Sequence, residues 1–176
     1  MHQKWTRLST ETVLTTPYYT VSHDRYVLPT GDVGHYHYID IAGSAMVVPV
    51  LDSGELVLVR QHRYLMRRDS LEFPAGGMKQ GSEALCTAQE ELREEAGYLA
   101  RTWERIGQFA PYNGASNEMC QVFVARGLEQ VGAQPDPTEE MALVLLTPDA
   151  LREGIARGEV WDGMTLASFH LFQVVA

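Results

Sequence analysis

The N-terminal quarter of the chain has the pattern of extended strands. Between Tyr19 and Ile41, the runs YTVSHDRYVLP and HYHYIDI flank the turn-forming residues TGD. The second run alternates its residue types, as strands do when their two faces meet different surroundings. The pattern predicts a β-hairpin over residues 19–41.

Two continuous apolar runs follow this hairpin. They are AMVVPVL, Ala45–Leu51, and ELVLVRQ, Glu55–Gln61, and the residues DSG, a strong hairpin signal, lie between them. Apolar runs of this length are typical of central strands that are covered on both faces. We therefore predict a hairpin of two central strands, with further strands at WERIGQF, MCQVFVAR and Met141–Leu146.

Three later segments have helical patterns with recognisable ends. A serine before the first segment and a threonine followed by proline before the second are suitable N-caps, and a glycine closes each of these two helices. Together with the strands, they predict an α+β fold in which helices cover both faces of a mixed β-sheet, an α/β/α sandwich. The predicted helices are Ser82–Ala96 closed by Gly97, Thr147–Arg157 closed by Gly158, and an amphipathic Thr165–Val175.

Composition limits the partners that such a domain can have. The 176 residues are 45% hydrophobic, which suits one compact domain. A net charge of -9 argues against nucleic acid as a partner, because phosphate backbones are bound by clustered Lys and Arg. No apolar run approaches the roughly 20 residues that cross a membrane, and Cys86 and Cys120 follow no metal or disulfide spacing. We expect a cytoplasmic protein that binds a cation or a small molecule.

The first predicted helix carries an unusual density of acids in the stretch QEELREEAGY. At about 100° per residue, Glu91, Glu94 and Glu95 share an arc of roughly 100° on one helix face. A solvated acidic face is the simplest interpretation. However, acids at a helix C-terminus oppose the helix dipole, and the glycine-rich loop before the helix offers carbonyl oxygens as well. Such oxygen donors suit a hard divalent cation such as Mg²⁺.

The segment GGMKQGSEALCTAQEELREEAGY resembles the Nudix box, G-x(5)-E-x(7)-R-E-U-x-E-E-x-G-U, where U is aliphatic or aromatic. Two positions depart from the pattern. Ser82 stands where the box has its first glutamate, and Glu90 stands where it has an arginine that orients the neighbouring glutamates. Arg93, one turn away, is a candidate to replace that lost cation. The positions that match the box are Gly76, Glu91, Leu92, Glu94, Glu95, Gly97 and Tyr98.

The resemblance extends to both flanks of the box and indicates the ADP-ribose pyrophosphatase branch of the family. Upstream, RQHR at 60–63 and LEFPAGG at 71–77 are similar to that branch, and so are IGQFAPYNGASNEMCQVFVAR and the C-terminal segment downstream. Asn113 replaces a proline that is often found in this branch. The similarity implies a Nudix fold with residues 43–176 as the hydrolase domain and residues 1–42 as an N-terminal hairpin extension through which the chain forms a homodimer.

Family correspondence also implies the residues of a metal site. It assigns coordination of Mg²⁺, with Mn²⁺ as an alternative, to Glu91, Glu95, Glu94 and the backbone carbonyl of Ala75. Glu72 is a second candidate beside the metal or the substrate. In this reaction, metal ions and carboxylates together neutralise and clamp a diphosphate.

The resemblance further implies a general base and substrate contacts. Glu139 and Glu140 lie where this branch carries its base on a loop before the last strand, and Glu94 competes for the same role. The substrate-binding candidates are Arg60, Arg63, Glu72 and Glu118.

The leading hypothesis is a hydrolase that converts ADP-ribose to AMP and ribose 5-phosphate. Two alternatives stay open. One is the same chemistry on another nucleotide-sugar or on a dinucleotide, which Asn113 favours. The other is a Nudix-fold sensor that binds a nucleotide without hydrolysing it, which Ser82 and Glu90 favour.

Overall fold

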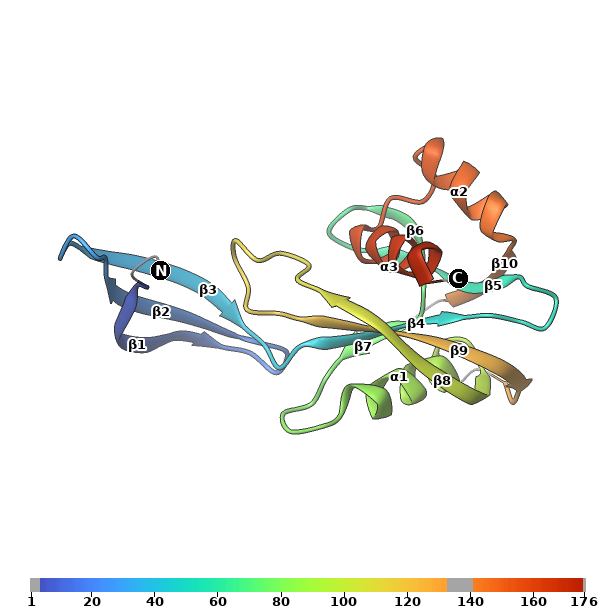
Figure 1. Cartoon of the computed structure of the whole chain (residues 1–176), viewed down its shortest axis with the longest axis horizontal. Helices are drawn as coiled ribbons and strands as arrows, with labels where there is room; N and C mark the ends of the chain where they lie inside the picture. The colour runs from blue at the N-terminus through green and yellow to red at the C-terminus, as the bar shows by residue number, and fades with distance from the viewer. Residues whose placement is uncertain (1–3, 133–140, 176) are drawn as a thin grey trace. The chain divides into compact units, whose positions relative to one another are not determined.

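The computed structural model describes residues 4–132 and 141–175 (Figure 1). The chain divides into two compact units, Met1–Gly43 with Tyr112–Glu118, and Ser44–Pro111 with Met119–Ala176. The described residues form ten strands and three helices, so the predicted α+β class is confirmed. None of the helices in the described ranges is long and apolar enough to cross a membrane.

The first unit is a three-stranded antiparallel sheet in the order β1-β2-β3. Its strands are β1 Thr6–Thr15, β2 Thr20–Val27 and β3 Val33–Asp40. Strands β2 and β3 form the predicted hairpin, and Gly31 in its turn has φ 91°. The sequence did not predict β1 or the packing of loop 112–118 on β3, where the Ile39 N–H donates to the Ala115 carbonyl at 2.8 Å.

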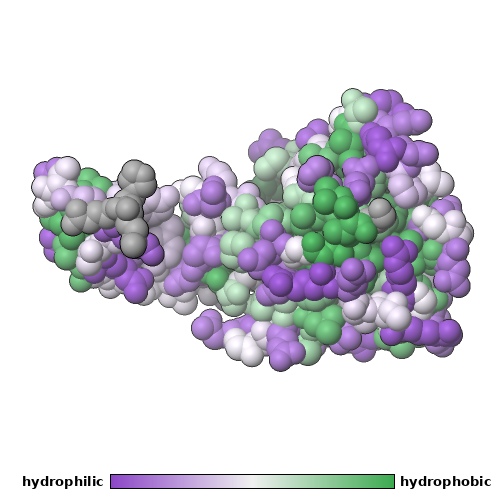
Figure 2. All heavy atoms as spheres, in the orientation of Figure 1, coloured by the Kyte–Doolittle hydropathy of each residue, from purple (hydrophilic) through white to green (hydrophobic). Residues whose placement is uncertain are grey.

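All ten residues of β1 are exposed. Figure 2 shows polar and apolar residues intermingled on the face of this unit that is in view. Because β1 is an edge strand, one row of its backbone groups has no neighbouring strand within the described sheet.

The second unit contains two sheets. One is mixed, in the order β7-β4-β9-β8, with β4 parallel to β9 and its other pairs antiparallel; the other sheet is antiparallel, in the order β10-β5-β6. Two strands are longer than the patterns predicted: one begins at Tyr98 rather than at Trp103, and the other ends at Gln130 rather than at Arg126. The strands are β4 Ser44–Pro49, β5 Leu56–Arg63, β6 Arg68–Glu72, β7 Ala75–Gly77, β8 Tyr98–Phe109, β9 Cys120–Gln130 and β10 Met141–Leu146.

The predicted hairpin of β4 with β5 is wrong. The DSG turn is present, since the Leu51 N–H donates to the Glu55 carbonyl at 2.9 Å, but the two strands share only one bridge, Val50 with Leu56. They then diverge into different sheets, where each lies between two other strands. Both are central and apolar, as predicted, and strands of this kind can find their neighbours elsewhere in the chain.

Helices cover both faces of the mixed sheet, which confirms the sandwich (Figure 1). The second unit has two hydrophobic cores, and alternate residues of β4 belong to each. Ala45 and Val47 pack with α1, Ala84–Glu94, whereas Met46 and Val48 pack with α3, Gly163–Val175. Helix α2, Pro148–Ala156, adds Leu151 to the second core.

Helix ends correct two predictions. Glu83, not Ser82, occupies the N-cap position of α1, without a side-chain cap bond, and the Ser82 hydroxyl donates to the Lys79 carbonyl at 2.7 Å. Helix α3 begins two residues earlier than predicted, with Asp162 before it. The Thr147 cap of α2 is confirmed by its bond from the Ala150 N–H at 3.1 Å.

Candidate active site

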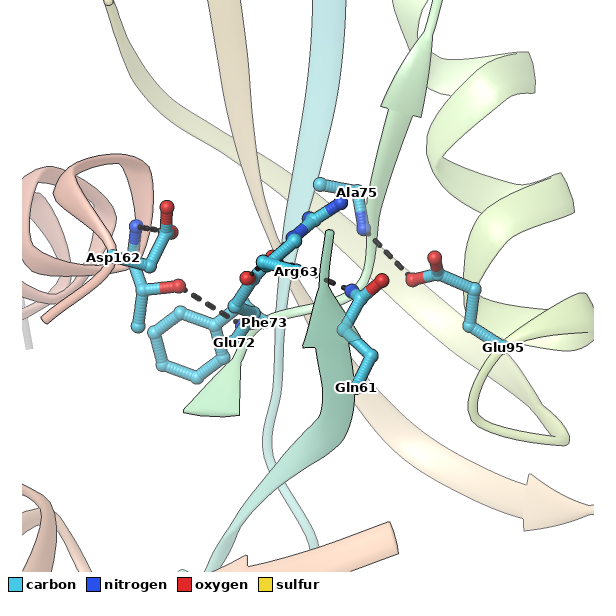
Figure 3. Close-up of polar contacts among 8 residues, drawn as sticks. Gln61, Arg63, Glu72, Phe73, Ala75, Glu95 and Asp162 are labelled. Atoms are coloured by element: carbon cyan, nitrogen blue, oxygen red, sulfur yellow. Dashed lines mark hydrogen bonds and ion pairs between the residues drawn. The ribbon is translucent and has the colours of Figure 1, made fainter. Parts of the chain in front are cut away.

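Two carboxylates, Glu91 on α1 and Glu95 directly after this helix, face consecutive residues of β7. The Ala75 N–H donates to Glu95 Oε2 at 3.0 Å, and Glu95 is buried (Figure 3). A β-carbon placed on Gly76 would lie 1.8 Å from Glu91 Oε1, so the Glu91 carboxylate rests on the backbone of this glycine. Acids one helical turn apart therefore converge on the start of β7 because α1 packs against that strand.

A second polar cluster joins the last residue of β5, Arg63, to the last residue of β6, Glu72. Glu72 is buried, and Arg63 Nε donates to its Oε1 at 2.7 Å, while Arg63 Nη2 donates to its Oε2. Gln61 Nε2 adds a longer bond to the same Oε2 at 3.4 Å (Figure 3). This bidentate arrangement fixes both the position and the plane of the Arg63 guanidinium.

The electrostatic environment links this pair to the acids of α1. The hydrogen bond that Arg63 donates to Glu72 is the largest effect that raises the pKa of Arg63, and the negative charges of Glu72, Asp162 and Glu95 raise it further. Burial acts in the opposite direction. The Arg63 guanidinium thus lies in the negative field of carboxylates from three segments, the last residue of β6, the residue before α3 and the residue after α1.

Glu94 and the unusual Glu90 lie closer to solvent. The side chain of Glu94 is 47% exposed and pairs with Arg93, whose Nη2 is 2.6 Å from Glu94 Oε1. Glu90 is exposed. The arginine considered as a replacement for the missing cation of the box therefore holds Glu94.

The structure does not bring Arg60 together with Arg63. Residues three apart on a strand point to opposite faces, and Arg60 lines a cavity of about 260 Å³ between β5, β6 and α2. Glu118 belongs to the first unit, where its N–H donates to the Ser116 hydroxyl at 2.9 Å. Glu139 and Glu140 lie outside the described residues.

The chemistry of the donors fits a hard divalent cation. Glu91 and Glu95 offer carboxylate oxygens beside the backbone of Ala75 and Gly76, and oxygen donors of this kind are what Mg²⁺ and Mn²⁺ prefer. Within residues 4–132 and 141–175, no three His, Cys, Asp or Glu side chains gather into a metal-binding group. Glu94, turned toward Arg93, is the side chain that would have to rotate to join the other two.

Sequence reasoning missed three polar residues near these clusters. Gln61 bonds Glu72, Asp162 caps α3 through the Thr165 N–H at 2.7 Å, and the Thr165 hydroxyl accepts a bond from the Phe73 N–H at 3.2 Å. The cap had a sequence signal, an aspartate three residues before the predicted helix start. The bond of Gln61 with Glu72 joins two strands, and the bond of Phe73 with Thr165 joins residues far apart in sequence. No local sequence pattern indicates either bond.

The sequence of this chain is similar to a known domain family and to known proteins. The model of the NUDIX domain matches residues 41–167. The chain is 29% identical to an ADP-ribose pyrophosphatase of Bacillus subtilis, over 84% of this chain and 80% of that protein. It is 28% identical to a methanol dehydrogenase activator of Bacillus methanolicus, over 86% of this chain and 83% of that protein.

A solved structure described as an ADP compounds hydrolase shares the fold. Its TM-score with this chain is 0.85 at 20% sequence identity, over 98% of this chain and 94% of the solved one. The match of the NUDIX domain covers most of the chain, including β6, β7 and α1, the elements that form the candidate site. The chain is therefore a Nudix hydrolase, a member of the family whose ADP-ribose pyrophosphatase branch it resembles.

Proposed function

We propose that this protein hydrolyses ADP-ribose to AMP and ribose 5-phosphate with Mg²⁺ or Mn²⁺. The observation that carries the proposal is the placement of the Glu91 and Glu95 carboxylates against the consecutive residues Ala75 and Gly76. The names of the ADP-ribose pyrophosphatases among its relatives support this substrate. Other nucleotide-sugars and dinucleotides contain the same diphosphate and remain the alternatives.

The carboxylates and one carbonyl would hold the metal. Glu91, Glu95, Glu94 and the Ala75 carbonyl are the donors, and the bound cation would neutralise the charge that develops on the diphosphate oxygens. Glu95 also accepts the Ala75 N–H, so one side chain couples the helix to the strand that supplies the carbonyl. The short distance between helix and strand therefore sets the spacing of the donors.

Arg63 is the substrate-binding arginine of the proposal. Its Nε and Nη2 are bonded to Glu72, which leaves the Nη1 edge of a fixed guanidinium to donate to a phosphate or a ribose hydroxyl. Arg60 lies on the opposite face of β5, so we assign it no contact with the substrate at this site. Glu118 remains a candidate substrate contact from the first unit.

A carboxylate must take the proton of the attacking water. As the water oxygen bonds to one phosphorus, the bridging P–O bond breaks and the proton passes to the base. Among the residues that the structure describes, Glu94 is the candidate for this base, because it is half-exposed and adjoins Glu95. Glu139 and Glu140 are the other two candidates.

Hydrolysis of a substrate panel tests the proposed function. ADP-ribose, other nucleotide-sugars and dinucleotides are each incubated with Mg²⁺, Mn²⁺ or EDTA. We expect turnover of ADP-ribose that requires metal and falls by at least about 100-fold in Glu95→Gln, because a carboxylate that binds metal is lost. Glu104→Gln, an exposed acid on β8, is the matched control and should retain wild-type turnover.

Two outcomes would contradict the proposal. Faster turnover of another panel member would identify that compound, and not ADP-ribose, as the preferred substrate. No turnover of any compound, combined with a rise in melting temperature when one is added, would indicate a nucleotide sensor.

We also propose that the chain forms a homodimer through its N-terminal unit. The exposed edge strand β1 presents Leu8 and Leu14, each 52% exposed. Light scattering should give twice the chain mass, and Leu8→Asp with Leu14→Asp should give the mass of one chain. Val174→Asp, at another exposed apolar position, should leave the dimer intact. A single-chain mass for the wild type would refute the dimer.

A further inference from the structure

The connection between β6 and β7 is only two residues long and joins the two sheets of the second unit. It consists of Phe73 and Pro74, between Glu72 at the end of β6 and Ala75 at the start of β7. Both flanking residues belong to the candidate active site. The position of this short connection therefore sets how far the Glu72 carboxylate lies from the Ala75 backbone.

Three hydrogen bonds hold this connection in place. The Val47 N–H donates to the Pro74 carbonyl at 2.9 Å, and the Ala75 N–H donates to Glu95 at 3.0 Å. The third bond comes from α3, where the hydroxyl of Thr165 accepts the Phe73 N–H at 3.2 Å. Proline has no N–H, so the Phe73 amide is the one backbone donor of the two-residue connection.

The surroundings make the Thr165 bond hard to replace. Phe73 is 1% exposed and Thr165 is fully buried, so no bulk water reaches their contact. A buried backbone N–H that loses its acceptor carries the full cost of its desolvation. Movement of the connection toward another acceptor is the way to avoid that cost.

Asp162 fixes Thr165 in turn. Its Oδ2 accepts the Thr165 N–H at 2.7 Å, and its backbone carbonyl accepts the Leu166 N–H at 3.0 Å. These bonds cap the first turn of α3, and a capped helix start keeps the Thr165 side chain at a defined position. A chain of contacts thus runs from Asp162 through Thr165 and Phe73 to the residues on either side.

We infer that Thr165, held by Asp162, is a positioning residue of the Nudix site: it fixes the Phe73 amide and thereby the spacing between Glu72 and the Ala75 backbone to which Glu95 is bonded. This inference rests on the proposed function insofar as Glu95 and Ala75 take part in metal binding. Thr165 acts through the connection and touches neither metal nor substrate.

Substitutions of the hydroxyl test the inference. Thr165→Val keeps the shape and removes the acceptor, and Thr165→Ser keeps the acceptor. Ser168→Ala is the matched control, because Ser168 is equally buried on the same helix but its hydroxyl contacts Met46 Sδ, not the connection. Two quantities are measured without nucleotide: the dissociation constant for Mn²⁺ by calorimetry, and deuterium exchange of the Ala75 amide by NMR.

Thr165→Val should weaken Mn²⁺ binding about tenfold and speed exchange at Ala75, as loss of an outer-shell contact does at metal sites. Thr165→Ser should restore both values, and Ser168→Ala should leave both unchanged even if its melting temperature falls. A Thr165→Val protein that melts earlier but keeps wild-type Mn²⁺ affinity and wild-type exchange would overturn the inference, since the hydroxyl would then be merely structural.

A second pair of variants tests the same inference if Thr165→Val does not fold. Asp162→Ala removes the cap acceptor and should weaken Mn²⁺ binding, whereas Asp162→Asn keeps an acceptor and should bind like the wild type. Equal affinities in this pair would overturn the inference. A wild type that binds Mn²⁺ but hydrolyses nothing refutes only the proposed function, and a wild type that binds no Mn²⁺ refutes both.

Discussion

Gly76→Ala is expected to lower kcat/KM for ADP-ribose by about 100-fold while the protein stays folded. The added β-carbon would lie 1.8 Å from Glu91 Oε1 and 2.3 Å from its Cδ, far inside contact distance. The atoms in the way are the far end of a flexible side chain, so the carboxylate moves and the backbone need not. The substitution thus displaces a proposed metal ligand without removing it.

Stability should change little in the same variant. Gly76 does not have a positive φ, so alanine can adopt its backbone conformation, and the change is expected to stay within about 1 kcal/mol in denaturant unfolding. Activity and Mn²⁺ affinity are the quantities that should fall together.

The neighbouring glycine provides the control. A β-carbon on Gly77 meets no atom within 4 Å, and Gly77 does not have a positive φ either. Gly77→Ala should therefore keep wild-type activity and stability. Wild-type turnover in Gly76→Ala would show that the Glu91 carboxylate is not needed at its present position, and equal losses in both variants would point to the strand backbone.

Local patterns predicted most of the elements but not how they pair. The Thr147 cap and the Met141–Leu146 strand depend on neighbouring residues, and both are as predicted. The DSG turn also forms, yet the strands on either side diverge into different sheets. A turn signal reports on a few residues, whereas strand pairing depends on the whole buried surface, which no short window contains.

In the candidate site, too, local patterns predict some features, whereas others depend on how the chain packs. Glu91 and Glu95 could be grouped from sequence because one helix face carries both. The strand period of two could also have separated Arg60 from Arg63, since an odd spacing places side chains on opposite faces. The bond from Phe73 to Thr165 spans 92 residues and arises only when α3 packs on the sheet, so no local pattern contains it.

The ion pair of Arg63 with Glu72 gives the other large effect, this time on stability. Arg63→Met should lower the free energy of unfolding by about 3 kcal/mol, the lower end of the cost of breaking a buried pair. The two partners are unequal: the Glu72 side chain is 4% exposed and that of Arg63 is 48% exposed. Removing the arginine therefore leaves a buried carboxylate without its guanidinium, and Gln61 at 3.4 Å compensates only in part.

Arg60→Met is the matched control for this experiment. Arg60 is exposed on the same strand and no carboxylate in the described ranges pairs with it, so its replacement should change the free energy of unfolding by less than about 0.5 kcal/mol. Urea unfolding of both variants and the wild type measures the difference. Equal stabilities of the two variants would mean that the Glu72 carboxylate finds another partner or water.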